Sequence, residues 1–294
     1  MNTLHINNIS KTYTNGVKAL DKVNLKISNG MFGLLGANGA GKSSLMRTIA
    51  ALQQPSEGSI TFNAVDIVKT PEAVRTVLGF LPQEFGVYPK ISAQELLNYL
   101  AILKGIQNKK ERKEQVDSLL QQTNLYQHRK KAVYTFSGGM KRRFGIAQAL
   151  LGNPKLIIVD EPTAGLDPEE RNRFLNLLSE IGKDIIVILS THIVEDVREL
   201  CKQMAILAKG QIIAAGNPAD LVTTIKGKVW TKIIEKEELL AYQEEYQVIS
   251  SHLVGGETLI KVLSDHLPAP DFNATTVGLE DYYFAQMHLF QSQN

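Results

Sequence analysis

The stretch Gly36-Ala37-Asn38-Gly39-Ala40-Gly41-Lys42-Ser43 matches the phosphate-loop pattern G-x-x-x-x-G-K-[ST] at every fixed position. The apolar run Met31 to Leu35 before it predicts a buried strand, while Leu45, Ile49 and Leu52 after it share one helical face. A strand, a glycine-rich loop and a helix in this order direct backbone N–H groups and a helix N-terminus at one oxyanion. The stretch therefore predicts a nucleotide-binding site.

Two side chains in this loop have predicted chemical roles. Lys42 reaches the β- and γ-phosphates of a bound nucleotide, and the Ser43 hydroxyl is a candidate Mg²⁺ ligand. A chance match to the pattern in a chain of this length is roughly a one-in-a-hundred event. The predicted nucleotide-binding residues of this segment are Gly36, Ala37, Asn38, Gly39, Ala40, Gly41, Lys42, Ser43 and Ser44.

The composition is that of an ordinary globular protein. The chain has 294 residues, 44% of them hydrophobic, and a net charge of +2, which gives no reason to expect nucleic acid as a partner. Its single cysteine, Cys201, excludes an internal disulfide, favours a reducing compartment and is expected to pack in a helix. The longest apolar runs, such as Ile185 to Leu189, are too short to cross a bilayer, and the N-terminus lacks the pattern of a signal peptide. We expect a cytoplasmic polypeptide, for which any membrane role must come through a partner.

Strands and helices alternate along most of the chain, which predicts an α/β core with a mainly parallel sheet. The helices include one that a capping box at Ser92 and Glu95 begins, and one that Asp167 and Pro168 begin. A hairpin is expected at Lys209-Gly210. The expected strands are Leu4 to Ile9, Val23 to Ile27, Met31 to Leu35, Ser59 to Phe62, Val77 to Leu81, Leu156 to Val159, Ile185 to Leu189, Met204 to Leu207, Gln211 to Ala215, Val229 to Ile234, Val248 to Leu253 and Thr258 to Leu263.

The chain divides into two predicted units. Residues 1–220 are expected to form a P-loop NTPase core with an N-terminal antiparallel β subdomain and an inserted α-helical subdomain at about 84–152. Residues 221–294 are expected to form a small C-terminal α+β extension, in which no chemical motif is found. Its contribution to function is open: contact with a partner, stabilisation of a dimer, or regulation.

A second chemical motif is the run Leu156 to Val159 followed by Asp160 and Glu161. In a P-loop protein, an acid at the end of such a strand holds Mg²⁺ opposite the loop serine, and Asp160 suits that role. Glu161 is placed to polarise an attacking water as a general base. Two solvated acids at a strand end are the alternative, which the phosphate loop makes the weaker interpretation.

The order of five motifs resembles the ATP-binding-cassette (ABC) ATPases, from about Leu4 to Pro218. They are the phosphate loop, Gln83, Ser137-Gly138-Gly139, the acidic pair and His192. The resemblance implies that Tyr13 stacks on adenine, that Gln83 joins the metal and water shell and senses a transmembrane partner, and that His192 is the switch histidine near the γ-phosphate. It also implies catalytic roles for Glu161, His192 and Lys42, and metal ligation by Ser43, Gln83 and Asp160, with ATP and Mg²⁺ as cofactors.

The signature segment Phe136-Ser137-Gly138-Gly139-Met140 departs from the Leu-Ser-Gly-Gly-Gln of the family at both ends. The serine and both glycines, which should contact phosphate at a helix N-terminus, are intact. The methionine, followed by Lys141-Arg142-Arg143, resembles the branch that serves ABC-2-type exporters. So does the segment Leu279-Glu280-Asp281-Tyr282-Tyr283 near the end of the chain.

In the family, the signature of one subunit closes over the ATP that the other subunit holds, and Gly165-Leu166-Asp167 matches the loop that contacts the opposing subunit. The resemblance therefore implies a head-to-tail homodimer, or a pair with a homologous ATPase subunit. It also implies a separate integral membrane permease, contacted through the region from Gln83 to Lys104, and a peripheral location on the inner face of the cell membrane. Transported substrate, direction of transport and the choice of homo- or heterodimer stay open.

Two other classes of protein are alternatives to a transporter ATPase. A soluble ABC ATPase acting on DNA or ribosomes would carry a long coiled coil or a second cassette, and this chain has one cassette and only Glu84 to Phe136 between its halves. A GTPase switch would need an Asn-Lys-x-Asp segment to read guanine. The nearest match, Asn108-Lys109-Lys110-Glu111, departs at its last residue.

Overall fold

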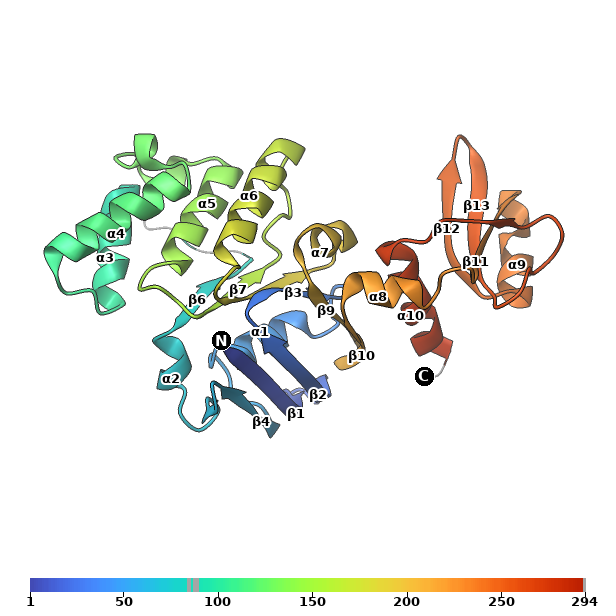
Figure 1. Ribbon diagram of the computed structural model, residues 1–294, viewed down its shortest axis with the longest axis horizontal. Coiled ribbons are helices and arrows are strands. Elements are labelled where there is room, and N and C mark those ends of the chain that lie inside the picture. Colours follow the sequence, from blue (N-terminus) through green and yellow to red (C-terminus); the bar gives the residue numbers. More distant parts are fainter. Residues whose placement is uncertain (84–85, 87–89, 293–294) are drawn as a thin grey trace.

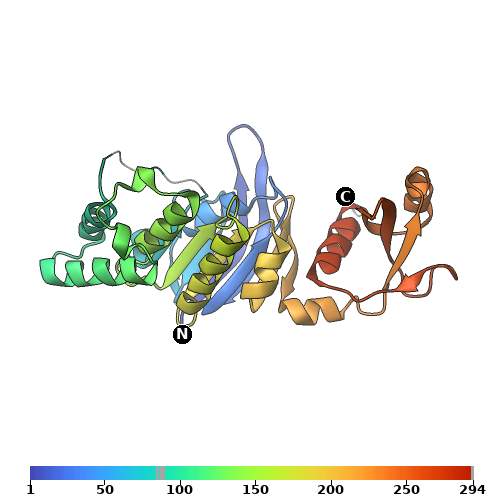
Figure 2. The same cartoon turned by 90° about the horizontal axis from the view of Figure 1, so that it is seen from above.

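The computed structural model describes residues 1–83, 86 and 90–292. Three sheets are found among these residues, and the molecule is elongated, with helices α3 and α4 near one end and strands β11–β13 near the other (Figures 1 and 2). In the described part of the chain, no helix is both long and apolar enough to cross a membrane.

The central sheet has the strand order β10-β9-β3-β8-β7-β6 and confirms the prediction of a mainly parallel sheet. Only β10 runs antiparallel to its neighbour, β9. Every residue of β7 and β8 is buried, as expected of parallel strands that are covered on both faces. The strands are β3 Gly30–Leu35, β6 Leu78–Leu81, β7 Leu156–Asp160, β8 Ile186–Thr191, β9 Gln203–Ala208 and β10 Gln211–Gly216.

The second sheet, in the order β2-β1-β4-β5, is the predicted N-terminal antiparallel β subdomain. Apolar residues of this sheet, of helix α1 (Lys42–Ile49) and of one face of the central sheet form a single hydrophobic cluster. The phosphate loop, which lies between β3 and α1, is therefore anchored at both ends. The strands are β1 Thr3–Thr12, β2 Lys18–Ser28, β4 Glu57–Phe62 and the short β5 Val65–Asp66, which was not predicted.

A different set of helices packs against the opposite face of the central sheet. Phe174 and Leu178 of α6 (Pro168–Ile181) and Val197 of α7 (Val194–Leu200) share a second cluster with the strands. Predicted site residues lie at the end of β7 and directly after β8, and each strand is followed by one of these helices, so their packing fixes the carboxyl ends of both strands.

The inserted helical block has a core of its own. Leu97, Leu120 and Phe144 are fully buried within it, and the predicted capping box at Ser92 and Glu95 is present. The predicted start of the block, at residue 84, lies outside the described residues, and the proposed domain limits stay predictions. The elements are α2 Glu72–Arg75 before the block and, within it, α3 Ala93–Leu103, α4 Lys109–Gln122, η1 Tyr126–His128, η2 Val133–Thr135 and α5 Gly138–Ala149.

The C-terminal residues form an α+β unit in the strand order β12-β13-β11-β14. Tyr242, Tyr246 and Phe272 pack together in its core. Helix α10 returns from this unit to contact α7, α8 and β10, and its Leu279 and Tyr282 join the second cluster of the central sheet. The elements are α8 Pro218–Thr223, β11 Val229–Ile234, η3 Lys236–Glu238, α9 Leu239–Glu245, β12 Val248–Val254, β13 Glu257–Leu263, β14 Asn273–Ala274 and α10 Leu279–Ser292.

Two helices end earlier than the apolar pattern predicts. Helix α1 stops at Ile49 instead of continuing to Leu52, because Ala51 has a φ of 53° and the Leu52 N–H bonds back to the Arg47 carbonyl. Helix α7 stops before Cys201, which is buried all the same, and this burial raises the pKa of its thiol. Packing is therefore the role that the structure gives Cys201.

Candidate nucleotide-binding site

The phosphate loop has the backbone shape that its glycines predict. Gly39 and Gly41 have φ values of 79° and 108°, in the left-handed region that favours glycine. A Cβ at Gly41 would lie 2.4 Å from the Ala19 carbonyl oxygen, so no larger residue fits there without moving β2. The shape of the loop therefore depends on the left-handed backbone of two glycines and on the close approach of β2.

Lys42 is the first residue of α1, and only 6% of its side chain is exposed. Its ammonium donates to the Gly36 and Ala37 carbonyls, at 2.7 and 3.2 Å, and lies 3.2 Å from Glu161 Oε1. These contacts hold a buried positive charge at the centre of the loop, where a phosphate oxygen would be attracted to it.

The acidic pair lies directly opposite the loop. The Ser43 hydroxyl donates to Asp160 Oδ2 at 3.1 Å, which brings together two of the predicted metal ligands. Asp160 Oδ1 is buried and has no hydrogen-bond partner among the described residues. A hard cation beside Ser43 would satisfy this oxygen, so the donor set fits Mg²⁺.

Glu161 and His192 are in direct contact. His192 Nδ1 lies 2.6 Å from Glu161 Oε2, and 8% of the glutamate side chain is exposed. The backbone of Glu161 has a φ of 48°, unusual for a residue with a side chain, and its N–H donates to the Ser190 carbonyl. The pair therefore joins the ends of β7 and β8, and the left-handed turn points the carboxylate at Lys42.

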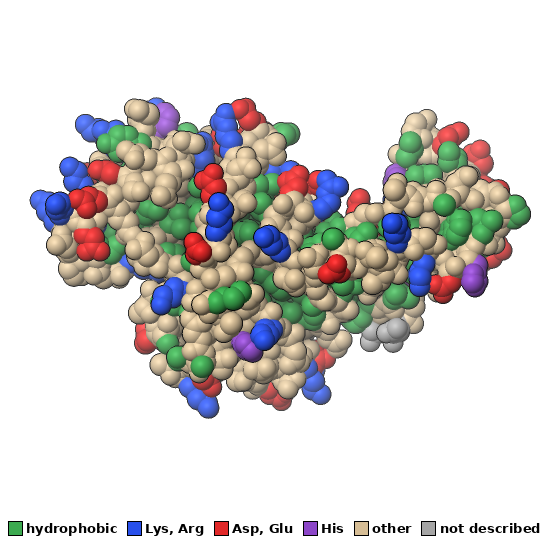
Figure 3. Space-filling model, viewed as in Figure 1, with side chains coloured by type: hydrophobic (Ala, Val, Ile, Leu, Met, Phe, Trp, Pro, Cys, Tyr) green, Lys and Arg blue, Asp and Glu red, His purple; other side chains and the backbone are tan. Residues whose placement is uncertain are grey.

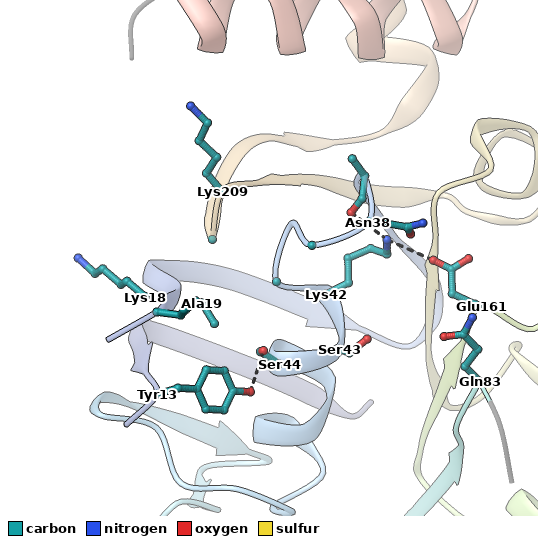
Figure 4. Close-up of a pocket in the computed structure, with 15 residues that line it drawn as sticks. Tyr13, Lys18, Ala19, Asn38, Lys42, Ser43, Ser44, Gln83, Glu161 and Lys209 are labelled. Carbon is teal, nitrogen blue, oxygen red and sulfur yellow. Dashed lines mark hydrogen bonds and ion pairs between the residues drawn. The ribbon is translucent and has the colours of Figure 1, made fainter. Parts of the chain in front are cut away.

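A pocket of about 390 Å³ lies between the loop and the N-terminal sheet. Figure 4 shows Lys42 pointing toward Glu161 across it, with Gln83 beside Glu161 and Tyr13 on the opposite side. The predicted residues that line the pocket are Tyr13, Ala37, Asn38, Gly39, Gly41, Lys42, Ser43, Ser44, Gln83 and Glu161. The predicted Gly36, Ala40, Asp160 and His192 do not line the pocket, but each bonds to a residue that does: Lys42, Gly210, Ser43 and Glu161, respectively.

Tyr13 follows β1 and is held in the pocket wall by its hydroxyl. This group is 3.0 Å from Ser44 Oγ and 3.2 Å from Gln53 Oε1. The contact with Ser44 joins the tyrosine to the helix that begins in the phosphate loop. The ring thus has a fixed position from which to stack on a planar base.

Five residues of the pocket lining were not predicted. They come from the beginning of β2 and from the β9–β10 turn, two segments that the fold brings next to the phosphate loop. The Gly210 N–H, for example, donates to the Ala40 carbonyl of that loop. No local motif marks these residues as part of a binding site, although Lys209-Gly210 was predicted as a hairpin turn. The residues are Val17, Lys18, Ala19, Lys209 and Gly210.

The signature segment lies apart from this pocket, at the N-terminus of α5, and Ser137, Gly138 and Gly139 do not line it. Ser137 caps the helix by accepting from the Met140 N–H at 3.2 Å. A Cβ at Gly139 would lie 2.5 Å from Glu170 Oε2, so this glycine also lets α5 approach α6. Among the residues that the structure describes, none has an atom within 4 Å of a Cβ built at Gly138.

The two departures in the signature have a packing explanation. Phe136 is 5% exposed and meets the Phe144 ring edge-on, with 6.4 Å between centroids, while Met140 is partly buried against the same core. Both residues fill the helical block, whereas Ser137 and Gly138 between them stay exposed and Gly139 is buried. Among the neighbouring predicted residues, Asp167 caps α6 by accepting from the Glu170 N–H at 2.9 Å.

Gln83 connects the helical block to the pocket. Its side chain lines the pocket, and its backbone carbonyl accepts from Arg142 Nη1 at 2.5 Å. This hydrogen bond joins α5 to a residue that lies beside Glu161. The rest of the segment proposed to sense a transmembrane partner includes residues 84–85 and 87–89, which lie outside the described part of the chain.

The doubly wound sheet, the glycine loop and the opposed acidic pair define a P-loop NTPase. Residues 20–164 match the family described as ABC transporter. The linearmycin resistance ATP-binding protein of Bacillus subtilis (strain 168) is 36% identical over 227 residues, which are 76% of this chain and 72% of that protein. The chain belongs to the ABC transporter ATP-binding proteins, and its activity is ATP hydrolysis.

Other relatives differ in their named functions. A methionine import ATP-binding protein of Oenococcus oeni is 34% identical over 230 residues, which are 75% of this chain and 65% of that protein. A solved dimeric ATP-binding cassette in a post-hydrolysis state, bound to ADP and Pi, is 27% identical, with a TM-score of 0.65 over 73% of this chain and 98% of that one. Importers and resistance proteins thus occur together among the similar proteins.

Proposed function

We propose that this chain powers export through a separate membrane permease, and that ATP closes two copies of it head to tail. The observation that supports a dimer is that the signature segment lies apart from the nucleotide pocket of its own chain. An exposed Gly138 at a helix N-terminus is a half-site for phosphate. The solved dimeric cassette with ADP and Pi supports such a pairing.

The proposed mechanism assigns one task to each side chain. Tyr13 stacks on the base, Lys42 neutralises the terminal phosphates, and Glu161 takes a proton from the attacking water. His192 holds the Glu161 carboxylate through the 2.6 Å contact. Ser43, Gln83 and Asp160 would hold Mg²⁺, which supplies charge neutralisation for the transferred phosphoryl group.

Export is proposed because the signature variant resembles the ABC-2 branch and because the name of one relative records linearmycin resistance. Basic and acidic side chains are interspersed over the face shown in Figure 3, which favours a protein partner over nucleic acid. Binding to the permease would hold this chain at the inner face of the cell membrane as a peripheral subunit. The transported substrate belongs to that partner, and this chain does not specify it.

A surface groove is the proposed docking site for the permease. It has a volume of about 300 Å³ and lies where the helical block meets β6 and α1. Leu52 and Leu103, which line it, are 60% and 67% exposed, and burial lowers the pKa of Lys104 beside them. Its mainly apolar lining suits a short amphipathic segment from a cytoplasmic loop of the permease.

Leu52→Glu and Leu103→Glu are expected to reduce recovery of the permease at least tenfold, because each places a charge in the apolar groove. The measurement is affinity purification from detergent-solubilised membranes, with integral membrane proteins quantified by mass spectrometry. Leu240→Glu, at a 73% exposed leucine of α9, is the matched control and should leave recovery unchanged. Recovery of ribosomes or DNA in place of an integral protein would support the soluble class of ABC ATPase instead.

A further inference from the structure

Asp196, the third residue of α7, is fully buried and has no part in the mechanism above. Its Oδ2 accepts from Thr163 Oγ1 at 2.5 Å and is 3.5 Å from Thr191 Oγ1. Its Oδ1 accepts from Arg171 Nε at 2.9 Å and pairs with Nη2 at 2.8 Å. One carboxylate therefore contacts the loop after β7, the last residue of β8 and helix α6.

The two chain segments that hold these threonines also carry proposed catalytic groups. Thr163 lies two residues after Glu161, and Thr191 lies directly before His192. Thr191 Oγ1 also accepts from the Ile193 N–H at 2.9 Å, which closes the turn around His192. Asp196 thus connects the backbone segments that present the two partners of the 2.6 Å Glu161–His192 contact.

The backbone conformation of Glu161 indicates what the contacts of Asp196 do. Its φ of 48° is a strained backbone state for a residue with a side chain, and such states persist only where the surroundings impose them. The bond to the Ser190 carbonyl restrains the turn at Glu161 itself, and the bond from Thr163 to Asp196 restrains it two residues later.

Core stability alone does not account for a carboxylate at this position. A buried ion pair such as Arg171–Asp196 is often replaceable by apolar residues at little cost in stability. An apolar side chain at position 196 would fill the same space but would bond to neither hydroxyl. The Asp196 carboxylate therefore adds a restraint on the distance between Thr163 and Thr191.

We propose that Asp196 is a positioning residue, which holds Glu161 and His192 in the geometry for hydrolysis through Thr163 and Thr191. The inference rests on the proposed function of Glu161 as general base. It adds that the turnover rate depends on a hydrogen-bond network which touches neither nucleotide nor metal.

Thr163→Val tests this because valine keeps the shape of threonine and removes its hydroxyl. We expect kcat to fall about tenfold, since small displacements of a catalytic group are costly, while KM for ATP stays within about twofold. Thr163→Ser, which keeps the hydroxyl, should recover most of the lost rate. In a Glu161→Gln background, Thr163→Val should cause no further loss, because the two changes act through one group.

Thr123→Val is the matched control. Thr123 is 1% exposed, and its hydroxyl donates to the Leu119 carbonyl inside the helical block. It should lower the melting temperature about as much as Thr163→Val and leave kcat unchanged. A Thr163→Val protein with normal kcat, or with a raised KM and normal kcat, would overturn the positioning role. Normal turnover by Glu161→Gln would instead overturn the general-base assignment, so the two failures are distinguishable.

Discussion

Glu161→Gln is expected to lower kcat about a thousandfold while ATP affinity changes by no more than a few-fold. General-base catalysis accounts for about 10²- to 10⁴-fold in rate, and a glutamine cannot accept the proton of the attacking water. The amide keeps the size of the carboxylate, so the pocket should keep its shape. It also removes the negative charge that faces Lys42 at 3.2 Å, which leaves the ammonium more available to phosphate.

Phosphate release under steady-state conditions gives kcat, and titration with a fluorescent ATP analogue gives the affinity. Glu169→Gln is the control, because Glu169 is 76% exposed on α6 and pairs only with Arg173 among the described residues. It should behave like the unaltered chain. Undiminished turnover in Glu161→Gln would show that another group activates the water.

Lys42→Ala, in contrast to Glu161→Gln, should act mainly on affinity. We expect it to weaken ATP binding about 10- to 100-fold, the equivalent of one or two charge-assisted hydrogen bonds. The loop carbonyls of Gly36 and Ala37, which now accept from the ammonium, would then face the phosphates without it. In the proposed mechanism bound ATP drives dimer closure, so closure should be lost together with affinity. Turnover should fall for the same reason.

The affinity of Lys42→Ala is measured with the same fluorescent analogue, and its closure by cross-linking with and without ATP. Lys26→Ala, at an exposed lysine of β2, controls for the loss of one positive charge. If Lys42→Ala closed with ATP as the unaltered chain does, the coupling between the loop and the dimer would be wrong.

The sequence was most informative where a local pattern has one physical interpretation. The loop from Gly36 to Ser43 and the apolar runs of β7 and β8 each predict a structure without reference to distant residues, and the sheet is as they predict. The signature was predictable as a motif because its serine cap and glycines are local features. The resemblance to ABC ATPases then supplied roles that no single motif carries.

Features created by tertiary contacts were not predictable. Ala19 and Lys209 line the pocket because β2 and the β9–β10 turn meet the loop, and neither position has a local signal. Asp196 is one acid among several on an amphipathic helix, and only its contacts with Thr163 and Thr191 distinguish it. The early end of α1 at Ile49 depends on a left-handed residue, Ala51, which the apolar periodicity does not reveal.

The structure gives the two signature departures, Phe136 and Met140, a packing role. From the intact serine and glycines between them, the sequence predicts that contact with ATP survives these departures. Both side chains pack into the helical block, whereas Gly138 between them is open to a partner. The departures are therefore compatible with an intact half-site.

The central claim is that two chains share each nucleotide site, and light scattering of Glu161→Gln with ATP and Mg²⁺ tests it most directly. We expect a mass twice the 32.5 kDa of one chain, because this variant does not consume the bound ATP. Adding Gly138→Glu should return the mass to that of one chain: the new side chain has room on the isolated subunit but places a negative charge against the partner's phosphates. A monomer with ATP in the first variant, or an ATP-dependent dimer in both, would contradict the shared site.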